Sequence, residues 1–403
     1  MTLRILTFTS LYPNATAPSS GVFVENRLRH LVAGGRVEAR VVAPVPWFPS
    51  TNPRFGRFAR FADVPLHETR HGIEVAHPRY AMVPGVGMNV SPFLMAMGAR
   101  ATIASLRRSG FDFDAIDAHY FYPDGVAAAL LSRWFDRPLV VTARGSDVAR
   151  LPDFALPRRM ILWAARRAAA VVAVCTALKT SLVTLGADAA KIQVLRNGVD
   201  LDAFRPVDRA AMRARLGLPP SARVIASVGN LIPLKGHHLV IEALAALPGA
   251  LLLIAGQGPE GDTLRHLADR FGVADRVTFL GQVPHADLPA IYGASDALVL
   301  ASSSEGWANV LLEAMACGTP VVSTDVGGSG EVVTAPEAGL LVAERSAAAL
   351  AAALRMLFAA PPSRDATRRF AERFSWDDTT RGQERLFASL VSPRSAATFE
   401  AVR

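Results

Sequence analysis

The sequence predicts an α/β protein of two domains, each a Rossmann-like, doubly wound parallel sheet, that face each other across a cleft. Short apolar runs of strand length alternate with stretches of helix length through both halves of the chain. This order is typical of parallel sheets with crossover helices. A chain of 403 residues is long enough for two separate cores. A polar, proline-bounded stretch at 201–220 is expected to connect the two domains.

Composition narrows the class of protein. Apolar residues make up 51% of the chain, yet no uninterrupted apolar run approaches the ~18 to 20 residues of a membrane span. The N-terminus begins directly with a strand and lacks the long apolar core of a signal peptide. The two cysteines, Cys175 and Cys317, have neither disulfide nor metal-site spacing. We therefore expect a cytoplasmic protein.

The charge of the chain is uneven. Residues 1–200 hold 24 Lys+Arg and 14 Asp+Glu, which gives +10, whereas residues 201–403 hold 19 and 21, which gives −2. A basic half suggests an anionic partner, and nucleic acid, anionic lipid and phosphorylated acceptors all fit on charge. The sequence has no recognisable nucleic-acid-binding module, so nucleic acid is not expected as a partner.

The segment 52–61 combines basic and aromatic residues. Arginine recurs every third residue and so does phenylalanine, which on a helix gives adjacent basic and aromatic stripes suited to a membrane surface. A solvated loop with its phenylalanines packed into the domain is the alternative. The first interpretation predicts peripheral contact with an anionic membrane through Arg54, Arg57 and Arg60.

The first βαβ unit consists of a strand at 3–8, a helix opened by Gly21 and a strand at 37–43. A right-handed crossover places the Gly21 loop at the carboxyl ends of the strands, where such sheets bind ligands. Glycine at this point would let the backbone approach a pyrophosphate closely. A glycine at a helix start also has an ordinary structural explanation.

Two further strand ends in the first half carry polar residues. His119 follows a short strand, and the loop after the strand 139–142 holds Arg144 and Asp147. The Asp112–Asp114 pair precedes its strand, so we interpret it as a solvated turn rather than a metal site.

In the second half, Lys235 stands just before a helix, where its ammonium could neutralise phosphate charge together with the helix N-terminus. Gly256 and Gly258 follow a strand in a Gly-x-Gly-x-x-Gly arrangement. A dinucleotide site would require an acid at the end of the next strand. That strand ends without one and Pro259 interrupts the turn, so a dehydrogenase is not favoured.

The stretch from Leu298 to Glu331 is predicted as a buried strand, a Ser-rich loop, a helix and a second strand. Asn309 is expected to cap the helix, which would run from Val310 to Cys317. Glu305 in the loop and Glu313 in the helix are eight residues apart. A loop carboxylate beside a helix N-terminus can face a reacting carbon while main-chain N–H groups hold an anion. Acids near a helix start are also common without any function.

The pattern SEGWANVLLEAMACGTPVV followed by STDVGGSGEVV resembles the signature of the family 4 retaining glycosyltransferases. The resemblance extends over nearly the whole chain and implies a GT-B fold. It implies domains at 1–200 (acceptor-binding) and 201–373 (nucleotide-sugar-binding), with a helix at 374–391 crossing back to the first. Relatives often have His-Gly-Ser-Asp where this chain has Arg144, which substitutes a fixed cation. They usually have an arginine where this chain has Asn230.

The resemblance also implies roles for individual residues. Glu305 and His119 would be catalytic, and Arg144 with Asp147 would lie on the acceptor side. The remaining residues divide into a set on the donor phosphates, namely Gly21, Lys235, Asn230, Gly306, Asn309 and Val310, and a set on the nucleotide, namely Glu313, Gly256, Gly258 and Val283.

The implied reaction is transfer of a sugar from a nucleotide diphosphate sugar to a hydroxyl of a glycolipid, polysaccharide or other acceptor, with the anomeric configuration retained. Its main physical need is to stabilise negative charge on the departing diphosphate. We expect main-chain N–H groups and Lys235 to do so without a metal or other cofactor. A nucleotide-sugar epimerase of the same fold and a non-catalytic nucleotide-sugar-binding partner are the alternatives.

Overall fold

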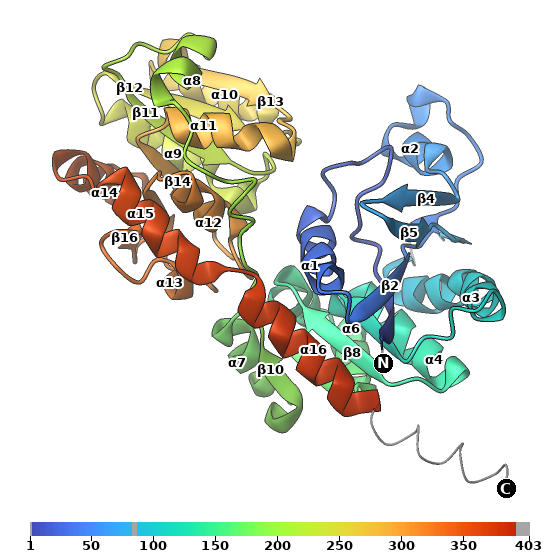
Figure 1. Cartoon of the computed structure of the whole chain (residues 1–403). Helices are drawn as coiled ribbons and strands as arrows, with labels where there is room; N and C mark the ends of the chain where they lie inside the picture. The colour runs from blue at the N-terminus through green and yellow to red at the C-terminus, as the bar shows by residue number, and fades with distance from the viewer. Residues whose placement is uncertain (1, 83–86, 392–403) are drawn as a thin grey trace, which may run out of the picture. The chain divides into compact units, whose positions relative to one another are not determined.

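The computed structural model describes residues 2–82 and 87–391. The chain forms two compact units (Figure 1). The N-terminal unit comprises the residues up to Arg196 and those from Asp377 onward, and the C-terminal unit is Asn197–Trp376. These divisions fall within a few residues of the predicted domain ends at 200 and 373. The α/β class with parallel strands, predicted from the alternation of apolar runs, is confirmed.

The N-terminal unit is built on an eight-stranded sheet in the order β10-β9-β8-β7-β1-β2-β5-β4. Its strands pair in parallel except at the edge, where β4 runs antiparallel to β5; the prediction of an entirely parallel sheet missed this strand. β3 (Val45–Pro46) and β6 (Arg79–Tyr80) form a separate pair. The sheet strands are β1 (Leu3–Phe8), β2 (Val37–Val42), β4 (His67–Arg70), β5 (Ile73–Ala76), β7 (Ala115–His119), β8 (Leu139–Ala143), β9 (Ala170–Ala173) and β10 (Ile192–Val194).

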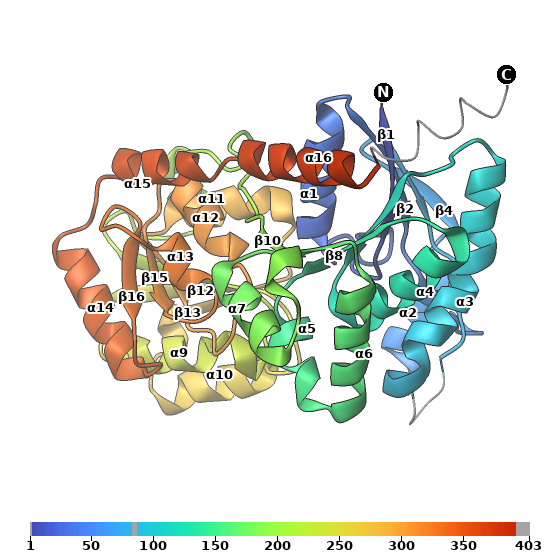
Figure 2. The same cartoon turned by 90° about the horizontal axis from the view of Figure 1, so that it is seen from below.

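Helices cover both faces of this sheet. α1 (Val22–Ala33) and α16 (Asp377–Val391) lie on one face, and α3 (Gly87–Arg108), α4 (Val126–Phe135) and α6 (Ala155–Arg167) lie on the other (Figure 2). Phe387 of α16 is buried with Val24 and Leu28 of α1, which ties the last helix to the N-terminal unit. The remaining helical segments are η1 (Pro53–Phe55), α2 (Arg57–Asp63), η2 (Phe121–Gly125), α5 (Ser146–Ala149), η3 (Leu151–Asp153), α7 (Thr176–Leu185) and η4 (Ala189–Lys191).

The basic and aromatic segment 52–61 is not one helix. Gly56, with φ 55° and ψ −127°, separates η1 from α2, so the expected continuous stripes do not form. The ring of Phe48 stacks on Phe58 at 5.7 Å and meets Phe55 edge-on at 5.4 Å. The aromatic residues therefore pack largely against one another. The side chain of Arg57 lies outside the described part of the chain.

The C-terminal unit has a six-stranded parallel sheet in the order β13-β12-β11-β14-β15-β16. Most of its strands are apolar and buried, as expected for a sheet covered on both faces. The strands are β11 (Arg223–Val228), β12 (Ala250–Ala255), β13 (Val277–Gly281), β14 (Ala297–Leu300), β15 (Val321–Thr324) and β16 (Gly339–Val342). The helices are α8 (Arg209–Arg215), η5 (Pro233–Lys235), α9 (His237–Ala245), α10 (Gly261–Arg270), η6 (Ala274–Arg276), η7 (His285–Asp287), α11 (Leu288–Ala294), α12 (Asn309–Ala316), α13 (Ser329–Val332), α14 (Ala347–Ala359), α15 (Arg364–Ala371) and η8 (Glu372–Phe374).

The predicted connection 201–220 contains a helix that the sequence analysis missed. α8 packs against α11, and its Arg213 is 3% exposed. The Nη2 atom of Arg213 donates to Oδ2 of Asp296 at 2.8 Å, and the same oxygen accepts from the N–H of Val224 at 2.8 Å. The segment is thus part of the C-terminal unit rather than a free linker.

We expect Asp296→Ala to lower the free energy of unfolding of the C-terminal unit by about 3 to 5 kcal/mol, because it leaves the buried guanidinium of Arg213 without its carboxylate. Urea unfolding measures this loss. Asp262→Ala is the matched control: Asp262 is 93% exposed in its pair with Arg265, so a change below about 1 kcal/mol is expected. Equal effects of the two variants would contradict the structural role of the Asp296 pair.

Candidate functional site

The C-terminal sheet has a single point at which the order of its strands reverses. The chain passes from β11 to β12 on one side and returns to β14 on the other side of β11. Ligands of such sheets bind outside the carboxyl ends of the strands at this switch point. The two loops that leave these ends, 229–236 after β11 and 301–308 after β14, carry Lys235 and Glu305. Two motifs predicted separately are therefore brought together.

Lys235 and Glu305 form an ion pair. The Nζ atom of Lys235 lies 2.6 Å from Oε1 of Glu305, and the hydroxyl of Ser302 donates to the same oxygen at 2.6 Å. The lysine side chain is 23% exposed and the glutamate side chain 10%. An anion that enters this site would therefore meet a largely covered ammonium already held in place by a carboxylate.

Two glycines let the loops of this site approach their neighbours. Gly236 has φ 71°, and a Cβ there would lie 2.0 Å from the carbonyl oxygen of Ala301. Gly327, with φ 56°, would place a Cβ 1.8 Å from the carbonyl oxygen of Glu305. The N–H of Gly328 donates to the carbonyl of Gly306 at 3.1 Å. The Gly-Gly-Ser-Gly-Glu motif, which continues into α13, thus supports the loop of Glu305.

The helix that follows Glu305 begins one residue earlier than expected. Asn309 is the first residue of α12 and Ala308 is its N-cap, without a side-chain cap; the prediction of Asn309 as N-cap was wrong. The side-chain oxygen of Asn309 accepts from Nδ2 of Asn197 at 3.3 Å, and its N–H donates to the carbonyl of Trp307 at 3.1 Å. Val310 is partly exposed beside it. Across the site, the side chain of Asn230 is exposed.

Glu313 is buried and held by two side chains that the sequence analysis did not identify. The hydroxyl of Tyr292 donates to Oε2 at 3.0 Å, and Nε2 of His285 lies 3.1 Å from Oε1. Burial, and after it the nearby Glu313 carboxylate, raise the pKa of Tyr292 well above its usual value, so the phenol remains a donor at neutral pH. The ring of His285 packs edge-on against Phe204 with centroids 4.9 Å apart.

The glycines predicted at the nucleotide have close main-chain neighbours. A Cβ on Gly256, which has φ 155°, would lie 1.8 Å from the carbonyl oxygen of Gly229, and one on Gly258 would lie 2.3 Å from that of Leu231. They therefore bring the turn after β12 against the 229–236 loop. Val283, on the next loop, is partly buried.

The N-terminal sheet has its own switch point between β1 and β7. The Gly21 loop follows β1, and His119 is the last residue of β7, so both lie at the same sheet edge. Gly21 has φ 71°, and a Cβ there would lie 2.2 Å from the carbonyl oxygen of Leu11. Chain packing alone therefore accounts for a glycine at this position.

His119 is 1% exposed and lies between a carboxylate and a guanidinium. Its Nε2 is 3.2 Å from Oδ2 of Asp117, and its Nδ1 is 2.7 Å from Nη2 of Arg144. A guanidinium can only donate, so Nδ1 accepts and the proton of the neutral ring is on Nε2, facing Asp117. The pKa of His119 is lowered to about 4, chiefly by burial; Asp117 opposes the shift and Arg144 adds to it.

Arg144 and Asp147 are more enclosed than their predicted acceptor-side role suggests. The guanidinium of Arg144 lies over the ring of Phe23 at 5.2 Å, and burial lowers its pKa to about 9. The carboxylate of Asp147 accepts from the N–H groups of Gly145 at 2.7 Å and Phe121 at 2.8 Å. Asp147 thus fixes the loop after β8, and an acceptor-side role for it stays a prediction.

Comparison with known proteins agrees with the resemblance drawn from the motifs. Residues 21–203 match the family described as Glycosyltransferase Family 4, and residues 208–374 match the one described as Glycosyl transferases group 1. The chain belongs to the group 1 glycosyltransferases of family 4. The D-inositol 3-phosphate glycosyltransferases of Mycobacterium tuberculosis and Mycobacterium bovis are 45% identical over 207 residues, which cover 48% of this chain and 43% of theirs. The match thus spans less than half the length of these curated relatives.

Solved structures show the same GT-B fold. Sucrose-phosphate synthase from Thermosynechococcus elongatus superposes with a TM-score of 0.81 at 22% identity, covering 97% of this chain and 99% of that one. Anabaena HepE in complex with UDP superposes with a TM-score of 0.73 at 24% identity, covering 97% and 100%. At these identities the likeness establishes the fold.

Four residues of this glycosyltransferase were missed by sequence reasoning: Asp117, Ser302, His285 and Tyr292. Asp117 could have been found, because residues two apart in a strand share a face and the strand ends Asp-Ala-His. The others contact their glutamates from three to 28 residues away in the chain, without any spacing that marks them.

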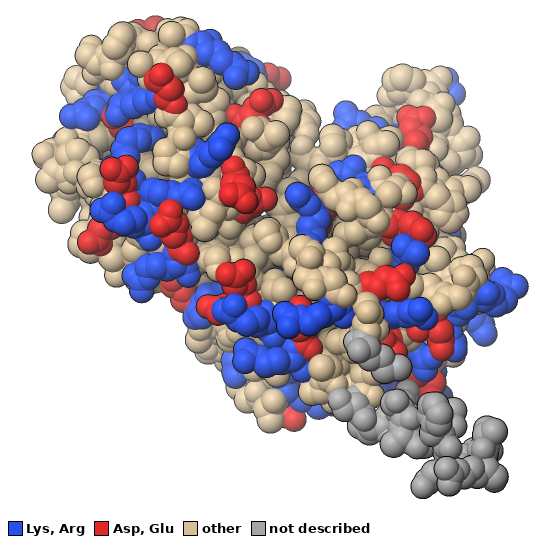
Figure 3. Space-filling model, viewed as in Figure 1, with Lys and Arg blue, Asp and Glu red and all other residues tan. Residues whose placement is uncertain are grey.

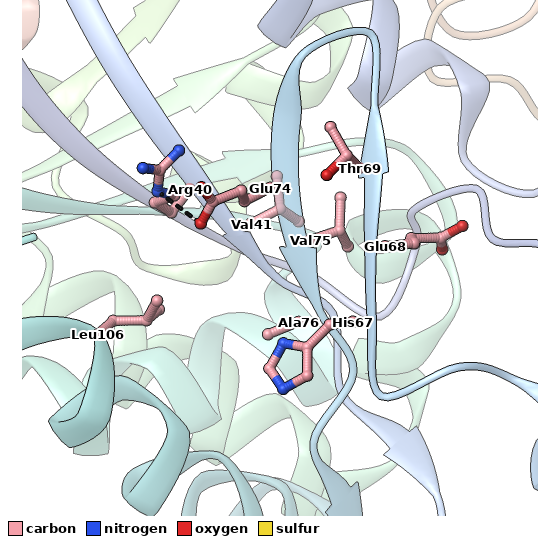
Figure 4. Close-up of a pocket in the computed structure, with 9 residues that line it drawn as sticks. All are labelled: Arg40, Val41, His67, Glu68, Thr69, Glu74, Val75, Ala76 and Leu106. Atoms are coloured by element: carbon pink, nitrogen blue, oxygen red, sulfur yellow. Dashed lines mark ion pairs between the residues drawn. The ribbon is translucent and has the colours of Figure 1, made fainter. Parts of the chain in front are cut away.

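A pocket of about 270 Å³ lies in the N-terminal unit, apart from the predicted residues. It is lined by β2, β4 and β5 together with Leu106 of α3 (Figure 4). Arg40 and Glu74 form an ion pair at its wall, 3.2 Å apart.

Two kinds of feature are absent from residues 2–82 and 87–391. None of the helices there is long and apolar enough to cross a membrane. No group of three or more His, Cys, Asp or Glu residues there could hold a metal ion. Metal independence stays a prediction.

The buried His119 predicts a pH dependence of stability. The unfolded chain binds a proton on this histidine below about pH 6.5, whereas the folded chain resists protonation down to a pKa of about 4. Stability from this group is therefore complete above pH 6.5 and is lost as the pH falls towards 4, by about 3 kcal/mol in total. Urea unfolding of the wild type and of His119→Asn at about pH 7 and about pH 4.5 measures it. The variant should lose less stability on acidification; equal losses would contradict a buried neutral imidazole.

Proposed function

We propose that this protein is a retaining glycosyltransferase that moves a sugar from a nucleotide diphosphate sugar to an acceptor hydroxyl. The observation that carries the proposal is the ion pair of Lys235 and Glu305 at the switch point of the C-terminal sheet. Family membership supplies the reaction class. The pair supplies an ammonium for the departing diphosphate and a carboxylate for the positive charge that develops on the sugar.

The diphosphate would be bound by Lys235 and by main-chain N–H groups of the 301–308 loop and the start of α12, without a metal. The Gly21 loop, at the switch point of the other sheet, would contribute N–H groups from the N-terminal unit. Donation from Lys235 to a phosphate oxygen requires it to share or exchange its bond to Glu305. The hydroxyl of Ser302 would continue to orient that carboxylate when the ammonium moves.

Glu313 would accept the ribose hydroxyls of the nucleotide. Each of its oxygens has one protein donor, Tyr292 or His285, and a carboxylate oxygen can accept a second bond. The two donors hold the carboxylate in one orientation, which is what selective binding of a diol needs. Val283, Gly256 and Gly258 would border the base.

In the N-terminal unit, His119 would act near the reacting bond as a neutral imidazole. Its Nδ1 accepts from Arg144 and its Nε2 faces Asp117, so both nitrogens are oriented by protein groups. Because both nitrogens already face protein groups, the ring would support the sugar site by its position and not by a hydrogen bond of its own to the sugar. Proton transfer by the ring is disfavoured at neutral pH, because its pKa of about 4 lies far below the working range.

Named relatives suggest classes for donor and acceptor. HepE was solved with UDP and with UDP-glucose, and the mycobacterial relatives act on D-inositol 3-phosphate by their name. We propose a UDP- or GDP-sugar as donor and a hydroxyl of a glycolipid or polysaccharide as acceptor; a phosphorylated polyol is the second candidate. Thermal stabilisation by UDP, GDP and ADP, and then by their sugars, identifies the donor. Detection of a glycosylated product separates transfer from epimerisation and from nucleotide binding without turnover.

We expect Glu305→Gln to lower the rate of sugar transfer by about 100-fold or more, because the amide cannot stabilise the developing positive charge. Nucleotide diphosphate binding should persist, since Lys235 remains. Product formation and calorimetric binding measure the two effects. Glu344→Gln, at an exposed acid of the same unit, is the control and should transfer normally. Unchanged turnover of Glu305→Gln would end the proposal.

We expect Lys235→Ala to weaken binding of the nucleotide diphosphate by about 10- to 100-fold, the value of a charge-assisted hydrogen bond. Binding of the nucleoside without phosphates should change little, because Lys235 is assigned to the diphosphate. Calorimetric titration with both ligands makes the comparison. Equal weakening for the two ligands would indicate that Lys235 maintains the loop instead.

A further inference from the structure

The helix layer α3, α4 and α6 has an unusual charge. Their sequences contain eight arginines and no aspartate or glutamate. Arg107 is half-buried and the others are exposed. Nearby carboxylates lie in the flanking connections and include Asp112, which pairs with Arg107 at 2.7 Å and with Arg137 at 2.8 Å. We call the exposed set the arginine face: Arg100, Arg108, Arg133, Arg158, Arg159, Arg166 and Arg167.

The three helices form one continuous surface. α4 packs against both α3 and α6, and α3 and α6 each pack on η2. All three lie on the face of the sheet opposite α1 and α16 (Figure 2). The guanidinium of Arg100 on α3 lies over the ring of Trp134 on α4 at 5.3 Å, so a cation–π contact joins two of the helices at the surface.

Helix electrostatics explains part of this charge but not all of it. Arg107, Arg108, Arg133, Arg166 and Arg167 stand in the last turns of their helices, where cations are favoured by the helix dipole. Arg158 and Arg159 stand near the amino end of α6, which has no acid in its first turn. The helix dipole therefore does not account for these two arginines, which are the fourth and fifth residues of α6.

Large apolar side chains are exposed among these arginines. Phe93 and Met97, one turn apart on α3, are 47% and 59% exposed, and Leu156 of α6 is 42% exposed. Phe154, just before α6, and Trp134 are also exposed. A surface that combines arginines with aromatic and aliphatic side chains is typical of proteins that lie on a membrane. In the view of Figure 3, basic and acidic side chains are interspersed over the surface of the C-terminal unit.

We propose that the arginine face binds the surface of an anionic lipid membrane. The guanidinium groups would pair with lipid phosphates, and Phe93, Met97 and Leu156 would enter the boundary between headgroups and acyl chains. Aliphatic side chains such as Met97 and Leu156 offer no stacking surface to a nucleic acid base, which favours lipid as the partner. The segment 52–61, whose aromatic rings pack against one another, would not be the main contact.

Vesicle co-sedimentation at low salt tests this proposal. The wild type should sediment with vesicles of phosphatidylcholine and phosphatidylglycerol and remain soluble with phosphatidylcholine alone. The double variant Arg158→Glu/Arg159→Glu should bind the anionic vesicles at least about 30-fold more weakly, since each arginine at an anionic surface contributes a factor of about 5 and the new acids are repelled. The thermal unfolding midpoint of the variant should match that of the wild type, which shows that the loss of binding does not come from unfolding.

The matched control is Arg215→Glu/Arg270→Glu, which reverses two exposed arginines of the C-terminal unit and should bind vesicles like the wild type. Phe93→Ser/Met97→Ser should also weaken binding, because these side chains enter the boundary between headgroups and acyl chains. Any of three vesicle results would overturn the proposal: no binding by the wild type, unchanged binding by Arg158→Glu/Arg159→Glu, or loss of binding on Arg54→Glu/Arg60→Glu while the α6 variant still binds. Tighter binding to a single-stranded oligonucleotide than to anionic vesicles would also reject it.

Discussion

The ion pair of Lys235 and Glu305 depends on the backbone more than on the two side chains. Each residue is on a loop that leaves one of two neighbouring strands, and these loops are placed by contacts that tolerate no Cβ. Gly236 meets the carbonyl of Ala301, at the root of the other loop, and Gly327 meets the carbonyl of Glu305 itself. The two charged groups therefore lie 2.6 Å apart without extending across open solvent. Holding extended side chains in one conformation there would cost conformational entropy.

In the N-terminal unit, burial keeps the central side chain neutral, whereas the C-terminal unit holds a charged pair. At its switch point a histidine, a carboxylate and a guanidinium are enclosed together, and His119 is held neutral with a defined tautomer. Arg144 explains why: a fixed donor on Nδ1 leaves the ring proton no alternative but Nε2. An imidazole partner could itself titrate and change role, whereas Arg144 remains a donor across the working pH range because its pKa stays near 9 even when buried.

The sequence allowed prediction of whatever depends on local periodicity and on motif order. Strand and helix alternation gave both sheets, and the Glu305 and Lys235 motifs gave a pair that meets in space. Elements of weak periodicity were missed. α8 is short and rich in arginine and alanine, so its sequence resembles a polar linker. Its Arg213 contacts Asp296, which lies 83 residues away in the chain. Asn309 was expected as a cap because asparagine favours that position, yet its side chain accepts from Asn197 instead. Tertiary partners decided both cases.

The scarcity of lysine makes the choice at position 235 informative. The chain has three lysines among 43 basic residues. Nζ of Lys179 donates to the carbonyl of Ile192, and Nζ of Lys191 donates to the carbonyls of Arg166 and Ala168, so each ammonium satisfies the main chain at the end of an element. Lys235 differs because its partner is a carboxylate. A compact ammonium with three donors can turn from that carboxylate to a phosphate without breaking a bidentate arrangement, which an arginine would have to do. At position 235, the proposed exchange of the cation between the carboxylate of Glu305 and a donor phosphate would favour lysine over arginine.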